Sequence, residues 1–104
     1  MSKDEKRYVG INNEINAGMT DTAKIIRDAW TFGVIPETET CENWTAGGLQ
    51  DLWDKVNARW EEYGFKVQNL PNDIRERFER IQKDAVEQAH QSGWDPDRDI
   101  QDDT

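Results

Sequence analysis

The chain has 104 residues and carries 22 Asp and Glu against 13 Lys and Arg, so its formal net charge is −9. This length suits one domain and leaves no room for a second domain with its own core. The acidic balance argues against direct binding to nucleic acid or to an anionic membrane, because both present phosphate groups.

Aliphatic residues are few, but five tryptophans and two tyrosines supply aromatic surface that an unfolded acidic chain would not need. Met1–Arg7 is charged and no apolar run follows it, so no secretory signal is expected. Cys41, the single cysteine, cannot form an internal disulfide. With no apolar stretch long enough to cross a bilayer, the sequence predicts a folded cytoplasmic protein.

Residues 1–10 are predicted to be a flexible leader to a single helical domain over residues 11–94. The first apolar residues, Ile11, Ile15 and Met19, recur at a spacing of four, which predicts a short helix ended by Gly18.

A clearer helix begins at Thr20–Thr22, because hydroxyls there can accept hydrogen bonds from the first free backbone amides. It continues with an apolar stripe at helical spacing and should stop at Gly33 in a left-handed conformation. The stripe is Ala23, Ile26, Ala29 and Trp30. Residues 36–47 then form a loop rich in Thr, Glu and Gly.

The strongest helical pattern runs from Leu49 to Tyr63, before Gly64. Its continuous apolar face is predicted to be buried and comprises Leu49, Leu52, Trp53, Val56, Trp60 and Tyr63. A long last helix follows, with Asn69 as its N-cap, Pro71 in its first turn and Gly93 as its stop. Its apolar stripe is Leu70, Ile74, Phe78, Ile81, Ala85 and Ala89.

The outward face of that last helix carries opposite charges four residues apart, such as Glu76 and Arg80, which predicts ion pairs along it. These elements together predict an all-α fold, a small three- to four-helix bundle. A long acidic loop and a mobile acidic C-terminal tail, residues 95–104, complete the expected architecture.

Two segments account for the whole charge excess. Residues 37–54 contain no Lys or Arg and five acids, namely Glu37, Glu39, Glu42, Asp51 and Asp54. Residues 94–104 contain five aspartates against Arg98 alone. One interpretation is a solvated loop and tail that serve solubility. The other is that one of these segments faces a basic partner.

Two tryptophans lie outside the helical stripes. Trp44 follows Cys41 and Glu42 in the acidic loop, where it either pins the loop to the core or anchors an interface. Trp94 has the same two interpretations, the first being a hydrophobic contact with the last turn of the final helix.

No set of residues predicts a catalytic, metal or cofactor site. Cys41 is flanked by acids that disfavour a thiolate, so a pairing with His90 is not expected to be catalytic. Asp95–Asp99 resembles the opening of a calcium loop but lacks the required glycine and the final acid. Gly47–Gly48 precedes a helix without any phosphate-loop pattern around it.

The leading prediction is a non-catalytic, small acidic helical module for protein–protein interaction or regulation. Its partner would be a protein with a basic rim around an apolar pocket, and homodimer formation is a second option. The predicted contact residues are Trp44, Glu37, Glu39, Glu42, Asp51, Asp54 and Trp94. The alternative is an acidic inhibitor that mimics nucleic acid and blocks a basic groove of its partner.

Overall fold

The structure is a computed structural model that describes residues 7–14, 19–91 and 93. It contains the 3-10 helices η1 (Ile11–Asn13) and η2 (Val67–Asn69), and the α-helices α1 (Asp21–Phe32), α2 (Ala46–Glu61) and α3 (Asn72–Gln91). The described residues contain no strand, which confirms the all-α class with three α-helices rather than four. Three parts of the sequence-based prediction lie outside the described residues: residues 1–6 of the leader, Trp94, and the acidic tail of residues 95–104.

Both ends of α1 are where the sequence places them. The Thr20 hydroxyl accepts a hydrogen bond from the Ala23 amide at 3.1 Å, and this satisfies one of the free amides of the first turn. Gly33 follows the helix with φ 72°, and its amide donates to carbonyl oxygens of the last turn. The short helix predicted from Ile11 is wrong in its described part, because helical structure stops at Asn13 and Glu14 is extended.

The bounds of the other two helices differ from the prediction. Thr45 caps α2 by accepting from the Gly48 amide, so the helix begins at Ala46 rather than at Leu49. Asn69 belongs to η2 instead of capping α3, and its side chain donates to the Tyr63 carbonyl at 2.9 Å. For α2, a local hydrogen bond at Thr45 therefore marks where the helix begins.

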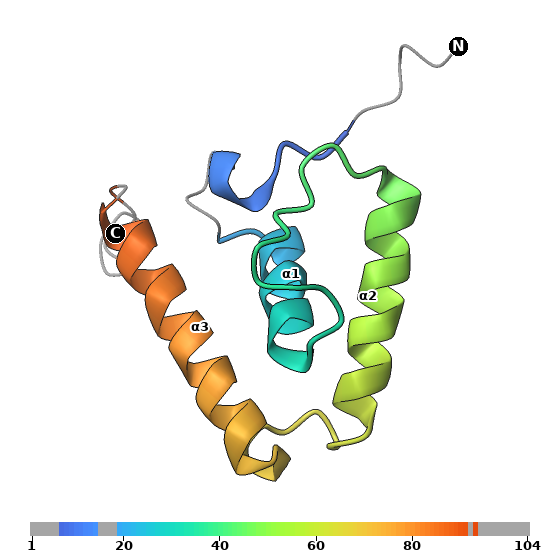
Figure 1. Cartoon of the computed structure of the whole chain (residues 1–104), viewed down its shortest axis with the longest axis vertical. Coiled ribbons are helices and arrows are strands. Elements are labelled where there is room, and N and C mark those ends of the chain that lie inside the picture. Colours follow the sequence, from blue (N-terminus) through green and yellow to red (C-terminus); the bar gives the residue numbers. More distant parts are fainter. Residues whose placement is uncertain (1–6, 15–18, 92, 94–104) are drawn as a thin grey trace, which may run out of the picture.

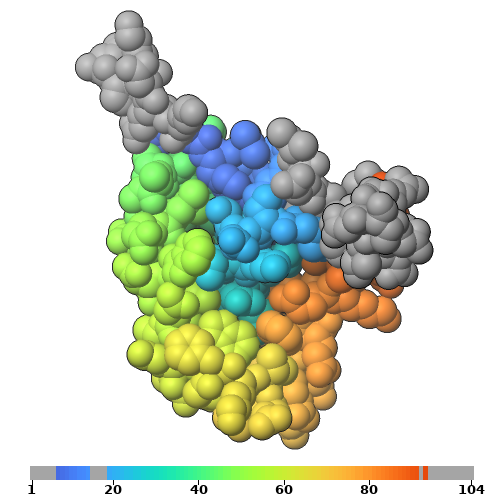
Figure 2. All heavy atoms as spheres, turned by 180° about the vertical axis from the view of Figure 1, so that it is seen from behind, coloured from blue at the N-terminus to red at the C-terminus, as the bar shows by residue number. Residues whose placement is uncertain are grey.

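Helix α1 lies between α2 and α3 and contacts both (Figure 1). The two outer helices are joined by residues 62–71 and diverge away from this connection. In the space-filling view, side chains of α2 (green) and α3 (orange) flank those of α1 from opposite sides (Figure 2). Helix α1 is therefore the central element of the bundle. None of the described helices is both long enough and apolar enough to span a bilayer.

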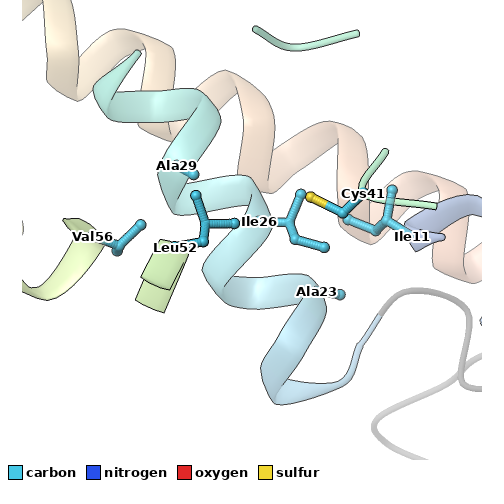
Figure 3. Packing of buried hydrophobic residues seen from close by; sticks show 7 residues of the cluster. All are labelled: Ile11, Ala23, Ile26, Ala29, Cys41, Leu52 and Val56. Carbon is cyan, nitrogen blue, oxygen red and sulfur yellow. The ribbon is translucent and has the colours of Figure 1, made fainter. Parts of the chain in front are cut away.

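The core is formed around Ile26 of α1, whose side chain is completely buried. Seven buried residues from α1, α2, η1 and the loop after α1 contribute to the cluster (Figure 3), namely Ile11, Ala23, Ile26, Ala29, Cys41, Leu52 and Val56. A second layer is aromatic: Trp60 of α2 contacts Phe32 and Phe78 edge to face, at centroid distances of 5.1 and 5.9 Å. Trp60 thereby links all three helices.

Two predictions about side chains are wrong. Trp53 was expected in the buried stripe of α2 but is 38 % exposed, because α2 packs mainly on α1 and only a narrow strip of its surface is covered. Arg80 was expected to pair with Glu76 along α3. Its guanidinium instead binds Glu37 of the loop between α1 and α2.

Candidate functional site: the acidic face of α2 and a separate cleft

Glu37, one of the predicted contact residues, is bound within the fold. Both of its carboxylate oxygens accept hydrogen bonds from Arg80 of α3, at 2.8 and 3.2 Å. These bonds hold the pKa of Glu37 below its ordinary value. The pair ties the loop after α1 to α3.

Glu39 is also used inside the molecule. One carboxylate oxygen accepts from the Cys41 amide at 2.9 Å, and the Glu39 carbonyl accepts from the Trp30 indole N–H at 2.9 Å. Cys41 has a φ of 64° and is fully buried. Burial, aided by the Glu39 charge, raises the pKa of its thiol to about 11. A buried, protonated thiol fills the core and is a poor nucleophile.

Trp44 is half-buried and packs against the core cluster. Its carbonyl accepts from the Tyr8 amide at 3.0 Å, and the neighbouring Asn43 amide donates to the Tyr8 carbonyl at 2.8 Å. Its position corresponds to the first of the two sequence interpretations, a residue that pins the loop. The sequence gives no signal for its backbone pairing with Tyr8, because 36 residues separate the two.

Glu42, Asp51 and Asp54 have exposed side chains. The Asp54 carboxylate accepts from the Gln50 amide at 3.1 Å. Within the described part of the chain, neither Asp51 nor Asp54 forms an ion pair. The structure therefore separates the five predicted acids into two that serve the fold and three that face outward.

Two exposed acids of α2, Asp54 and Glu61, lie within about 100° of Trp53 around the helix axis. At about 100° per residue, Asp54 lies about 100° around the axis from Trp53, with Gln50 and Glu61 between them. Lys55 and Arg59 lie at the opposite edge, and Arg59 pairs with Glu62 at 3.5 Å. We call the exposed set Gln50, Trp53, Asp54 and Glu61 the acidic face of α2; Asp51 lies outside it, about 160° from Trp53 and one turn before Lys55. The exposure of Trp53 was not predicted from the sequence, whose periodicity placed it in the buried stripe.

A cleft of about 530 Å³ lies elsewhere on the molecule, between η1, α1, the loop after α1 and α3. No residue of α2 lines it. Its lining includes apolar, amide and hydroxyl side chains, and five ionisable residues converge on it, namely Glu14, Arg27, Glu37, Arg80 and Asp84. This volume is typical of sites that hold small ligands.

A hydrogen-bonded network forms one wall of the cleft. The Glu14 carboxylate accepts from the Tyr8 hydroxyl and from the Thr20 hydroxyl, the latter at 2.8 Å. Arg27 is only 4 % exposed, and burial lowers its pKa while the charges of Asp28 and Glu14 oppose that shift. Burial and the Glu14 carboxylate together raise the pKa of Tyr8. The charges of Asp28 and Glu14 thus partly offset the burial of the Arg27 guanidinium.

This convergence was not predicted from the sequence, since the five ionisable residues come from four separate segments. One signal was available: Arg27 lies four residues after Ala23 and next to Ile26, so a charge occurs within the buried stripe of α1. Among the described residues, no three His, Cys, Asp or Glu side chains form a group that could hold a metal ion. Cys41 and His90 do not line the cleft.

Comparison of the chain with protein-family models, with curated protein sequences and with solved structures gives no match.

Proposed function

We propose that this protein is a non-catalytic interaction module that binds a protein partner through the acidic face of α2. The observation that carries the proposal is the partly exposed indole of Trp53 on the side of α2 that also carries the exposed carboxylates of Asp54 and Glu61, which form no ion pair within the described residues. A tryptophan ring presents about 150–250 Å² of surface, so 38 % exposure leaves roughly 60–95 Å² of it in water. Covering such a ring on binding is a common source of interface energy.

The charge around Trp53 indicates the chemistry of the partner. Asp54 and Glu61 flank the indole side of α2, whereas its bases lie at the far edge of the helix. A complementary surface offers an apolar pocket for the indole with Lys or Arg around it. This proposal keeps the partner type expected from the sequence and moves the aromatic anchor from Trp44 to Trp53.

The proposal of a non-catalytic role is supported by how the reactive groups are used. The Cys41 thiol is buried with a raised pKa, and Glu39 caps its amide. In the cleft, Glu37 is bound by Arg80, and Glu14 accepts from two hydroxyls. These groups hold the loop and α1 in place, which accounts for their positions without a reaction.

The alternatives receive less support. A nucleic-acid mimic needs a row of outward carboxylates, and Glu37 and Glu39 are used within the fold. A two-fold dimer through the acidic face of α2 would bring Asp54 and Glu61 of one copy near the same acids of the other. That repulsion favours a basic partner over a second copy.

Site-directed photocrosslinking tests the proposal. A benzophenone amino acid replaces Trp53 in one protein and Lys55 in a matched control, and both are irradiated in extract of the source cells. We expect a discrete adduct with one protein from position 53 and none with it from position 55. The captured protein, once purified, should bind the unmodified chain with an affinity that falls as salt is added.

Two outcomes contradict the proposal. One is the same adduct pattern from positions 53 and 55, which would show that the reagent samples the whole surface of α2. The other is a captured protein that binds equally well after Trp53→Ala. A concentration-independent monomer in sedimentation would in addition exclude the second copy as occupant.

A further inference from the structure

The lining of the cleft between α1 and α3 holds three carboxylates and two guanidinium groups. We propose that this cleft is a second binding site, separate from the acidic face of α2, and that it takes an arginine side chain of a protein or peptide. The inference does not rest on the proposed function, because no residue of α2 lines the cleft.

The sign of the ligand charge follows from the ionisable lining residues. Three carboxylates, of Glu14, Glu37 and Asp84, face two guanidinium groups, of Arg27 and Arg80, which leaves a net charge of −1. Arg80 is held by two hydrogen bonds to Glu37 and also lies within the electrostatic range of Asp84. Asp84 is exposed, and in the described part of the chain no ion pair engages its carboxylate. It is the carboxylate available to a ligand.

An anionic ligand fits this lining less well. It would have to draw Arg80 away from Glu37, or approach Arg27, which is 4 % exposed and lies near the charges of Glu14 and Asp28. Acids of the fold therefore already lie close to both arginines. A positively charged ligand, by contrast, can approach the exposed Asp84 carboxylate, which no ion pair among the described residues holds.

The uncharged part of the lining favours arginine over a compact cation. Trp30 contributes an indole whose N–H is bound to the Glu39 carbonyl, so the ring is held in position at the cleft. Ile81 and Ala85 of α3 provide apolar surface for an aliphatic stem. Guanidinium is planar, stacks on aromatic rings and is weakly hydrated, and its five donors suit the side-chain oxygens of Thr38, Thr40 and Gln88.

Titration with short peptides tests the proposal. The probes are acetyl-Gly-Arg-Gly-amide, the same peptide with citrulline, which keeps the shape and removes the charge, and the same peptide with Glu. Binding is followed by the indole N–H resonance of Trp30 in the NMR spectrum, assigned from Trp30→Phe. We expect a saturable shift with the arginine peptide, and little shift with the citrulline or Glu peptide.

Two protein variants remove one negative charge each from α3. Asp84→Asn changes the cleft, whereas Glu79→Gln changes a site about 140° around the helix and outside the lining. We expect Asp84→Asn to weaken binding of the arginine peptide about threefold to fivefold, as for a solvent-exposed ion pair, and Glu79→Gln to leave it within the error. Circular dichroism confirms that both variants remain folded.

Four results would each overturn the assignment of an arginine site. They are equal binding of the arginine and citrulline peptides, equal weakening by both variants, stronger binding of the Glu peptide, and the absence of a saturable shift. Trp53→Ala should leave this titration unchanged. Failure of the crosslinking test at position 53 and failure of the peptide titration are therefore separate results.

Discussion

Ile26 provides a direct test of the packing on which both sites depend. Its side chain is fully buried at the centre of α1, the helix that contacts α2 and α3. Replacing it with alanine removes three carbon atoms, and a buried methylene group contributes about 0.8 kcal/mol, so the transfer loss is about 2.4 kcal/mol. The cavity that remains adds to this loss, and we expect Ile26→Ala to lower the free energy of unfolding by about 3–4 kcal/mol.

Urea denaturation followed by far-UV circular dichroism measures the effect. Ile26→Val should cost about 0.5–1.5 kcal/mol, because it removes one methyl group from the same position. Val86 on α3 is 40 % exposed, so Val86→Ala is the matched control and should stay within about 0.5 kcal/mol of the parent chain. If Ile26→Ala costs no more than Val86→Ala, α1 is not the packed centre of the molecule.

Three further predictions concern single residues. Gly33 has φ 72° with open space where a Cβ would lie, so Gly33→Ala should cost about 1–2 kcal/mol in urea denaturation, from the left-handed conformation alone; no loss would contradict the cap geometry. Burial raises the pKa of the Cys41 thiol from 9.0 to about 11, so the thiolate at pH 8 is about a hundredfold less populated in the folded chain. Alkylation of Cys41 should therefore be at least a hundredfold slower in the folded chain than in the urea-unfolded chain. Comparable rates in the two states would contradict the burial of this thiol. Burial raises the pKa of Asp28 in the folded chain above 3.8, despite the hydrogen bond from Trp60. Ionisation of Asp28 therefore opposes folding, and the free energy of unfolding falls as the pH rises from 3.8 through the pKa of the folded state. Asp28→Asn should therefore be more stable than the parent at pH 7 and lose that advantage below pH 3.8; a variant less stable at pH 7 would refute this.

Local features of the fold were predictable from the sequence. Thr20 and Gly33 lie at the two ends of α1, as expected. Each forms hydrogen bonds with backbone groups of the adjoining helical turn. The apolar periodicity also identified α2 and α3 as helices, because a spacing of three and four residues places apolar side chains on one face of a helix. Leu70, Ile81 and Ala89 of the predicted last stripe are indeed buried.

The predictions that depended on tertiary contacts succeeded less well. The apolar stripe of α2 includes Trp53, but periodicity does not reveal how wide a neighbouring helix is, and α1 leaves the indole partly exposed. Helical spacing likewise suggested Glu76 as the partner of Arg80. A carboxylate 43 residues away is better placed, since Glu37 accepts two hydrogen bonds from the guanidinium.

The candidate sites show the same contrast between local features, which were predictable, and tertiary contacts, which were not. The acidic residues of the 37–54 segment were evident from composition, yet which of them bond within the fold depends on the path of the loop, and Glu37 and Glu39 both do so. The cleft could not be predicted, because it exists only where α3 lies beside the loop and η1.

The central claim, that the acidic face of α2 is the partner-binding surface, is tested most directly by calorimetric titration of the purified partner with Trp53→Ala. A buried tryptophan anchor contributes 2 kcal/mol or more, so we expect affinity to fall by about thirtyfold or more. The matched variant Lys55→Gln, at the opposite edge of α2, should bind as the parent does. An unchanged affinity for Trp53→Ala, or an equal loss in both variants, would contradict the claim.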